Sequence, residues 1–229
     1  MRPVVFLPGL LCDSALWQAQ TGALADGAHA LIPPLDQHDS ITALAAEVLA
    51  AAPATFALVG LSMGGYVAFE ILRQAPERIE RLALFDTSAR PDTPEQKEKR
   101  RALIQLSRTG KFKGVTPRLL PMLIHPAHME TPAITETIIA MANRIGKEGF
   151  QRQQHAIMNR PDSRPLLPAI KCPALIAVGN EDQLTPPEIA SEMAGLIPQA
   201  RLEIIPQCGH LPPLEQPEKT TALLRAWLA

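Results

Sequence analysis

The sequence predicts an α/β fold, a mostly parallel sheet of about six strands flanked by helices, with a helical insertion after the fourth strand. Short apolar runs alternate with helix-length segments, and this alternation produces parallel strands joined by right-handed crossovers. The alternation stops between residues 88 and 168, where only helical patterns occur. With 229 residues, of which 46% are hydrophobic, the chain is long enough to bury one core without disulfides.

Six apolar runs bounded by turn residues are the expected strands. The first run ends at Pro8-Gly9 and the second stops at Pro33-Pro34, because proline lacks the amide that a central strand donates. In chain order, the expected strands are residues 3–7, 29–32, 56–59, 81–85, 174–178 and 201–205.

Helices are expected in the segments between these strands. The clearest is 40–52, in which apolar residues recur at a spacing of three and four. The others are 14–25, 64–74, 187–196 and 217–228, with 94–108, 117–124, 131–145 and 149–159 in the insertion. We therefore predict a core formed by residues 1–87 and 169–229 and a helical cap insertion formed by residues 88–168.

Charge and cysteine content exclude several classes of function. A net charge of −1 argues against a nucleic-acid binder that relies on a basic surface. Three separated cysteines without a CxxC pair give no zinc pattern and fit a reducing compartment. No apolar run approaches the length of a membrane span, and the run at 4–7 is too short for a signal peptide. A cytoplasmic protein with no nucleic-acid or membrane partner is expected.

One motif joins an apolar strand to a helix and carries a nucleophile. Gly60-Leu61-Ser62-Met63-Gly64 has the G-x-S-x-G spacing, in which the glycines relieve crowding around a serine on a sharp turn. Such a turn lifts the Ser62 hydroxyl clear of the sheet and aims the amide of Met63 at the space where an oxyanion forms. A plain helix-capping serine is the alternative.

A serine needs a base and an orienting carboxylate, and both follow later strands. His210 comes after the strand at 201–205, and Asp182 comes after the strand at 174–178. Because the carboxyl ends of parallel strands share one edge, these groups should meet Ser62 there. Asp86, which ends the fourth strand, and Glu181 are the alternatives for the carboxylate.

These segments resemble the α/β-hydrolase superfamily, in the group with a helical cap. The resemblance rests on Leu7-Pro8-Gly9-Leu10-Leu11, the serine elbow, Gly179-Asn180-Glu181-Asp182 and Gly209-His210. It implies the α/β-hydrolase fold, with Ser62 as nucleophile, His210 as base and Asp182 as its partner. It also implies that Leu10 supplies the second oxyanion-hole amide beside Met63. Pro8-Gly9 replaces the common His-Gly, which affects the shape expected for the oxyanion loop.

We therefore expect a serine hydrolase that cleaves small carboxylic esters through an acyl-enzyme and needs no cofactor or metal. A lactonase, a thioesterase, a carbon–carbon bond hydrolase and a cofactor-free perhydrolase are alternatives within the superfamily. A ligand receptor that reuses the fold without turnover is the alternative from another class. The oligomeric state is left open.

The insertion carries 14 Lys and Arg against 7 Asp and Glu, a net charge of +7. Most of this charge is expected to form a solvated helix face, with Lys97, Lys99, Arg100, Arg101, Lys111 and Lys113. Arg118 and Arg144 lie among apolar neighbours instead, which suggests a pocket that selects a carboxylate-bearing ester. Met122, Met141 and Met158 either line an acyl pocket or form the core of the insertion, and the second interpretation is preferred.

Overall fold

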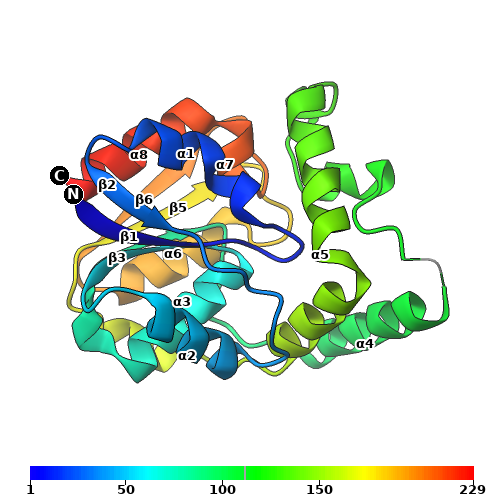
Figure 1. Ribbon diagram of the computed structural model, residues 1–229, viewed down its shortest axis with the longest axis horizontal. Coiled ribbons are helices and arrows are strands. Elements are labelled where there is room, and N and C mark those ends of the chain that lie inside the picture. Colours follow the sequence, from blue (N-terminus) through cyan, green and yellow to red (C-terminus); the bar gives the residue numbers. More distant parts are fainter. Residues whose placement is uncertain (111) are drawn as a thin grey trace.

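The computed structural model describes residues 1–110 and 112–229, so Lys111 lies outside the described residues. It confirms a fully parallel six-stranded sheet in the order β2-β1-β3-β4-β5-β6 (Figure 1). Register runs without a shift from β1 to β3, where Val4 faces Ala57 and Leu7 faces Gly60. The strands are β1 (Arg2–Leu7), β2 (Ala28–Leu31), β3 (Phe56–Leu61), β4 (Ile79–Phe85), β5 (Ala174–Gly179) and β6 (Ala200–Ile205).

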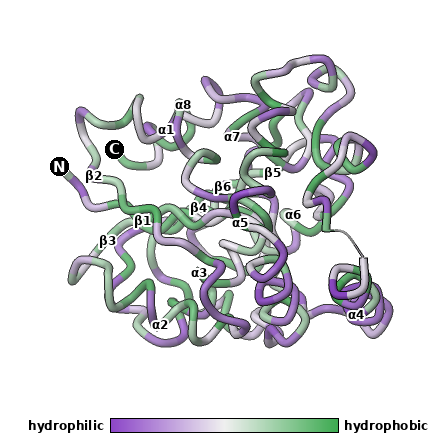
Figure 2. Tube along the Cα trace, turned by 45° about the vertical axis from the view of Figure 1, so that its right-hand side comes forward, coloured by the Kyte–Doolittle hydropathy of each residue, from purple (hydrophilic) through white to green (hydrophobic). Residues whose placement is uncertain are grey.

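Helices cover both faces of the sheet, and successive strand residues point to opposite faces. Val5 and Leu7 of β1 pack toward one face, whereas Val4 and Phe6 pack toward the other. The first face is covered by α2 (Ile41–Ala51), α3 (Met63–Gln74) and α6 (Pro187–Leu196). The second is covered by η1 (Ser14–Trp17), α1 (Gln18–Ala23) and α8 (Pro217–Leu228). Burial on both faces explains why the central strands β3 and β5, which are buried at every position, are built from apolar residues and glycine (Figure 2).

Between β4 and β5 the described chain is helical. This inserted segment, residues 88–168, contains α4 (Pro94–Thr109), η3 (Pro117–Met122), η4 (Pro126–His128) and α5 (Pro132–Met158), and it ends within η5 (Arg164–Ala169). Helix α5 stands beside the sheet, and α4 lies beside the lower part of α5, away from the sheet (Figure 1). Among the described helices, none combines the length and the apolar character that crossing a membrane requires.

Two of the expected helices differ in form from the sequence expectation, and several short helices were not expected. The helix expected at 14–25 divides into η1 and α1, and that at 117–124 is the 3₁₀ helix η3, whose Pro117 and Pro121 cannot donate α-helical bonds. The two helices expected at 131–145 and 149–159 are both present, joined within α5 by a kink at Gly146, where φ is 69° and ψ is −175°. A further short helix, α7 (Pro212–Glu215), was not expected.

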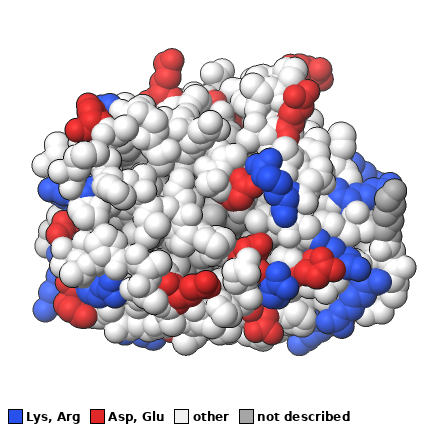
Figure 3. Space-filling view, in the orientation of Figure 1, with Lys and Arg blue, Asp and Glu red and all other residues white. Residues whose placement is uncertain are grey.

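One of the basic residues expected on a solvated face points inward. Arg100 of α4 donates to the buried carboxylate of Asp92 at 2.5 Å and to Gln154 of α5 at 2.8 Å. Arg160 completes the cluster by donating to Asp92 and by stacking on the ring of Tyr66 in α3 at 4.1 Å. A buried carboxylate needs positively charged or hydrogen-bonding partners. Arg100 therefore points toward Asp92 and does not lie with the other Lys and Arg side chains on the solvated face of the helix. Other Lys and Arg side chains do gather over α4 at the surface (Figure 3).

Candidate active site

Ser62 lies on a sharp turn between β3 and α3, as the G-x-S-x-G spacing predicted. Its backbone has φ 54° and ψ −114°, a conformation that residues other than glycine rarely adopt. A Cβ on Gly60 would lie 2.7 Å from Gly64, and one on Gly64 would lie 2.2 Å from the carbonyl oxygen of Leu7. The glycines are therefore required, because α3 begins in contact with the ends of β1 and β3.

Hydrogen bonds from β4 and its following loop hold the turn in place. The amide of Ser62 donates to the carbonyl of Phe85 at 3.0 Å, and the hydroxyl of Thr87 donates to the carbonyl of Ser62 at 2.7 Å. Gly65 lets Thr87 approach, since a Cβ there would lie 2.3 Å from the Thr87 oxygen. Ser62 as a residue is half-buried, so the turn is fixed but is not fully enclosed.

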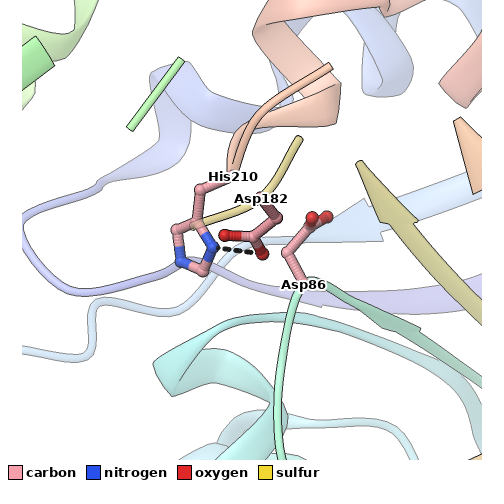
Figure 4. Close-up of side chains that lie close together, drawn as sticks. All are labelled: Asp86, Asp182 and His210. Carbon is pink, nitrogen blue, oxygen red and sulfur yellow. Dashed lines mark hydrogen bonds and ion pairs between the residues drawn. The ribbon is translucent and has the colours of Figure 1, made fainter. Parts of the chain in front are cut away.

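Asp182 and His210 form the hydrogen-bonded pair that the sequence suggested (Figure 4). The distance from Nδ1 of His210 to Oδ2 of Asp182 is 2.8 Å, and both side chains are buried. Three further donors hold the carboxylate. The hydroxyl of Thr185 reaches Oδ2 at 2.6 Å, and the amides of Leu184 and Thr185 reach Oδ1 at 2.8 and 3.2 Å.

These donors determine the charge of Asp182. Burial alone would raise the pKa of this carboxyl, but the electrostatic interaction with His210 and the hydrogen bonds from His210, Thr185 and Leu184 lower the pKa below its usual value. Asp182 is thus an anion that can orient the ring and stabilise its protonated form. Glu181, the neighbouring alternative, instead accepts the amide of Cys208 at 3.2 Å.

Asp86, the other alternative acid, lies beside this pair but is not bonded to His210. Ligand atoms of Asp86, Asp182 and His210 all lie within 4.8 Å of one another. Such spacing would suit a metal ion, yet Nδ1 and Oδ2 already bond to each other, and Oδ1 of Asp86 accepts the Gly179 amide at 2.8 Å. Oδ2 of Asp86 is buried without a partner among the described residues. Burial and the nearby charge of Asp182 raise the pKa of Asp86 well above its usual value, despite the Gly179 amide.

We expect Asp86→Asn to stabilise the fold increasingly as the pH rises. The folded chain keeps a proton on Asp86 that the unfolded chain releases near pH 4, so this residue costs more stability as pH climbs from about 4 toward its folded pKa. Asparagine stays neutral at every pH and removes the cost. Thermal unfolding midpoints at pH 5, 6.5 and 8 measure the effect, with the exposed Asp39→Asn as control. A difference that does not change with pH would show that Asp86 is ionised in the folded protein.

Glu215, which the sequence patterns did not predict as a site residue, organises the loop that carries His210. This buried carboxylate accepts the amides of Gly209 and Leu211, on either side of His210, at 3.0 Å. It also accepts the amide of His125 from the inserted segment at 2.6 Å. The amide of His210 donates in turn to the carbonyl of Leu123 at 2.9 Å. A Glu five residues after the Gly209-His210 pair was the available signal.

Replacing Glu215 with Gln should lower turnover by about 10- to 100-fold with little change in KM, because it loosens the His210 loop. The new amide group would face backbone N–H donors, and leaving buried donors unpaired costs roughly 1–3 kcal/mol of folding free energy. Steady-state kinetics and thermal unfolding measure the two effects. Glu218→Gln, at an exposed position of α8, is the matched control. If stability falls while turnover holds, Glu215 has no part in placing the base.

The loop after β1 contains the expected oxyanion amide of Leu10. The amide of Cys12 donates to the carbonyl of Gly9 at 3.1 Å, which closes a turn with Leu10 and Leu11 at its centre. Within the part of the chain that the structure describes, the amides of Leu10 and Met63 donate to no protein acceptor. Neither amide is therefore committed to a protein acceptor in that part of the chain.

The predicted pocket residues lie in different surroundings. Met141 and Met158 are buried and Met122 is 48% exposed, and Met141 packs in the apolar cluster that α5 shares with the sheet. Arg118 is exposed. Arg144 forms a two-pronged ion pair with Asp13, at 2.6 and 3.1 Å. Because that carboxylate already neutralises the guanidinium, we assign Arg144 to this contact rather than to a substrate anion.

The parallel sheet, the strained serine turn and the Asp–His pair beyond later strands place the chain in the α/β hydrolase class. A sequence model of the alpha/beta hydrolase family matches residues 4–223, and the chain belongs to that family.

Known relatives include several ester hydrolases. The chain is 28% identical over 193 residues to a pimeloyl-[acyl-carrier protein] methyl ester esterase of Nitrosomonas europaea, covering 81% of this chain and 75% of that protein. A thermophilic esterase from Thermogutta terrifontis, solved with malate bound, superposes with a TM-score of 0.89 at 35% identity, covering 100% of this chain and 89% of the other. An enol-lactonase from Burkholderia xenovorans gives a TM-score of 0.87 at 27% identity, covering 99% and 91%.

Proposed function

We propose that the protein hydrolyses carboxylic esters through an acyl-enzyme on Ser62. The observation that carries the proposal is the Asp182–His210 hydrogen bond at 2.8 Å, on the sheet edge where β3 ends in the strained Ser62 turn. A serine hydroxyl is a poor nucleophile at neutral pH until a base takes its proton. An imidazole held by a buried carboxylate is the group that enzymes of this kind use as that base.

The geometry supports a specific sequence of proton transfers. Because Nδ1–H of His210 donates to Asp182, the other ring nitrogen, Nε2, is free to accept a proton. His210 takes the Ser62 proton as Ser62 Oγ bonds to the ester carbon, and then passes it to the departing alcohol. Water cleaves the acyl-enzyme by the same route, again with His210 as base. The amides of Leu10 and Met63 stabilise the oxyanion in both steps.

The relatives support ester hydrolysis as the reaction class. Two of the similar proteins are esterases, and the third is an enol-lactonase. A lactone is a cyclic ester, so lactone opening requires the same nucleophile, base and oxyanion donors. We therefore keep a lactone as the second candidate substrate class, and the methyl ester named for the first relative makes small methyl esters the first to assay.

Two measurements test the proposal. A fluorophosphonate probe should label Ser62, identified by peptide mass, and a member of the fold that only binds ligands should not react. A panel of p-nitrophenyl esters of graded acyl length, with methyl esters, lactones and thioesters beside it, identifies the preferred class. Labelling without turnover of any ester or lactone would contradict the proposed reaction while leaving the activated serine in place.

A further inference from the structure

A buried amide side chain from α5 holds the oxyanion loop. Gln153 is fully buried, and its oxygen Oε1 accepts the amide of Leu11 at 3.0 Å. Its nitrogen Nε2 donates to the carbonyl of Leu35, in the loop after β2, at 3.2 Å. One side chain of the inserted segment thus connects the loops that follow two neighbouring strands.

The bonded amide belongs to the most constrained residue of that loop. Leu11 has φ 59°, the left-handed conformation that glycine usually supplies at the third position of a turn. A leucine persists there only when its surroundings impose the conformation. The bond to Gln153 is one such constraint, and the Gly9–Cys12 turn bond is another.

The orientation of the Leu10 amide depends on this turn. The Leu10 N–H and the Gly9 carbonyl belong to the same planar peptide, so the bond from the Cys12 amide to that carbonyl fixes the direction in which the Leu10 N–H points, and this turn requires the left-handed conformation of Leu11. The Leu11 amide donates to Gln153, whereas the Leu10 amide donates to no protein acceptor among the described residues. The two adjacent amides therefore differ: one holds the loop, and the other is left without a protein partner.

A second contact from the same helix restrains the same loop. Arg144 pairs with Asp13, whose Oδ1 also accepts the amide of Ala15 at the start of η1. The irregular backbone at Gly146 lies between Arg144 and Gln153 along α5. The helix therefore contacts the loop at two points, of which the Gln153 contact is buried and the Arg144 contact is exposed.

We propose that Gln153 is a positioning residue for the oxyanion hole, through which the inserted segment sets the direction of the Leu10 amide. The proposal rests on the ester hydrolysis proposed above. Oxyanion donors act on the transition state more than on the bound ester, so a misdirected Leu10 amide lowers kcat and leaves KM nearly unchanged. A purely structural loss would instead lower the folded fraction.

The test compares two neighbouring glutamines of α5. Gln153→Met keeps the side-chain length and removes the acceptor for Leu11. Gln154→Met is the matched control, because Gln154 is also buried but bonds to Arg100, away from the oxyanion loop. We expect Gln153→Met to lose about 10- to 100-fold in kcat, and Gln154→Met to stay within about threefold, after both are normalised to titrated active sites.

A transition-state analogue distinguishes positioning from folding. An aryl trifluoromethyl ketone forms an oxyanion on Ser62, so its inhibition constant should weaken in Gln153→Met by the same factor as kcat/KM falls. Loss of kcat without weaker inhibition, or equal losses in the two Met variants, would overturn the proposal. If wild type hydrolyses esters, Ser62→Ala does not, and Gln153→Met matches wild type, only the role of Gln153 is refuted.

A measurement on the unmodified protein covers the case in which Gln153→Met does not fold. In amide hydrogen exchange followed by NMR, the Leu11 amide should be protected in the free enzyme. The Leu10 amide should exchange readily until the trifluoromethyl ketone is bound and then become protected. Rapid exchange at Leu11, or no change at Leu10, would contradict the arrangement on which the proposal depends.

Discussion

Ser62→Ala should lower ester turnover by about 10⁴-fold or more, because the members of a catalytic triad act as a unit. The variant removes only the hydroxyl oxygen. The backbone at position 62 is held by the bonds to Phe85 and Thr87, neither of which uses that hydroxyl. The fold should therefore persist, and the loss should be confined to chemistry. Affinity for a substrate-like ketone that forms no covalent bond should change little.

The measurement needs a preparation free of contaminating esterases, since a variant this slow is easily masked. Fluorophosphonate labelling, circular dichroism and thermal unfolding should accompany the kinetics. Ser191→Ala is a suitable control, because Ser191 is an exposed serine in α6 whose hydroxyl donates to the carbonyl of Pro187 in the same helix. Ester turnover that survives in a clean Ser62→Ala preparation would remove Ser62 from the mechanism.

The sheet was predictable because each strand carries its own signal. Runs such as 56–59 and 174–178 are apolar at every position, and a strand buried on both faces requires that composition. Because parallel strands end at the same edge of a sheet, the ends of β3 and β5 lie on one edge. Parallel pairing alone therefore predicts that Ser62 and Asp182 lie near each other. The serine turn was equally predictable, because its glycines are required by crowding within a few residues of chain.

The features that sequence did not predict depend on contacts between distant residues. Gln153 and Leu11 are 142 positions apart, and nothing in the pattern of α5 distinguishes Gln153 from Gln154. Arg100 sits in a run of basic residues, yet its neighbours in space are Asp92 and Gln154. Local periodicity decides which elements form, whereas the partner of a buried polar side chain is set by how the elements pack.

The second large effect is expected for Asp182→Asn, and the hydrogen bonds around this residue show why. Oδ1 accepts two backbone amides, from Leu184 and Thr185, which cannot become acceptors. Oδ2 accepts the hydroxyl of Thr185, which can rotate to accept instead, and Nδ1 of His210. The amide NH₂ of asparagine therefore takes the Oδ2 position and donates to Nδ1. That bond holds His210 in the tautomer with the proton on Nε2, which cannot accept the proton of Ser62.

Turnover at neutral pH should fall by about 10⁴-fold in Asp182→Asn while the fold is kept, since the wrong tautomer disables the base. The ¹⁵N shifts of the His210 ring would show the proton move from Nδ1 to Nε2, an outcome that general destabilisation does not produce. Asp86→Asn is the matched control, because Asp86 ends the adjacent strand and lies beside Asp182 without a bond to His210. It should retain turnover within about tenfold of wild type. A larger loss in Asp86→Asn than in Asp182→Asn would move the orienting acid from the end of β5 to the end of β4.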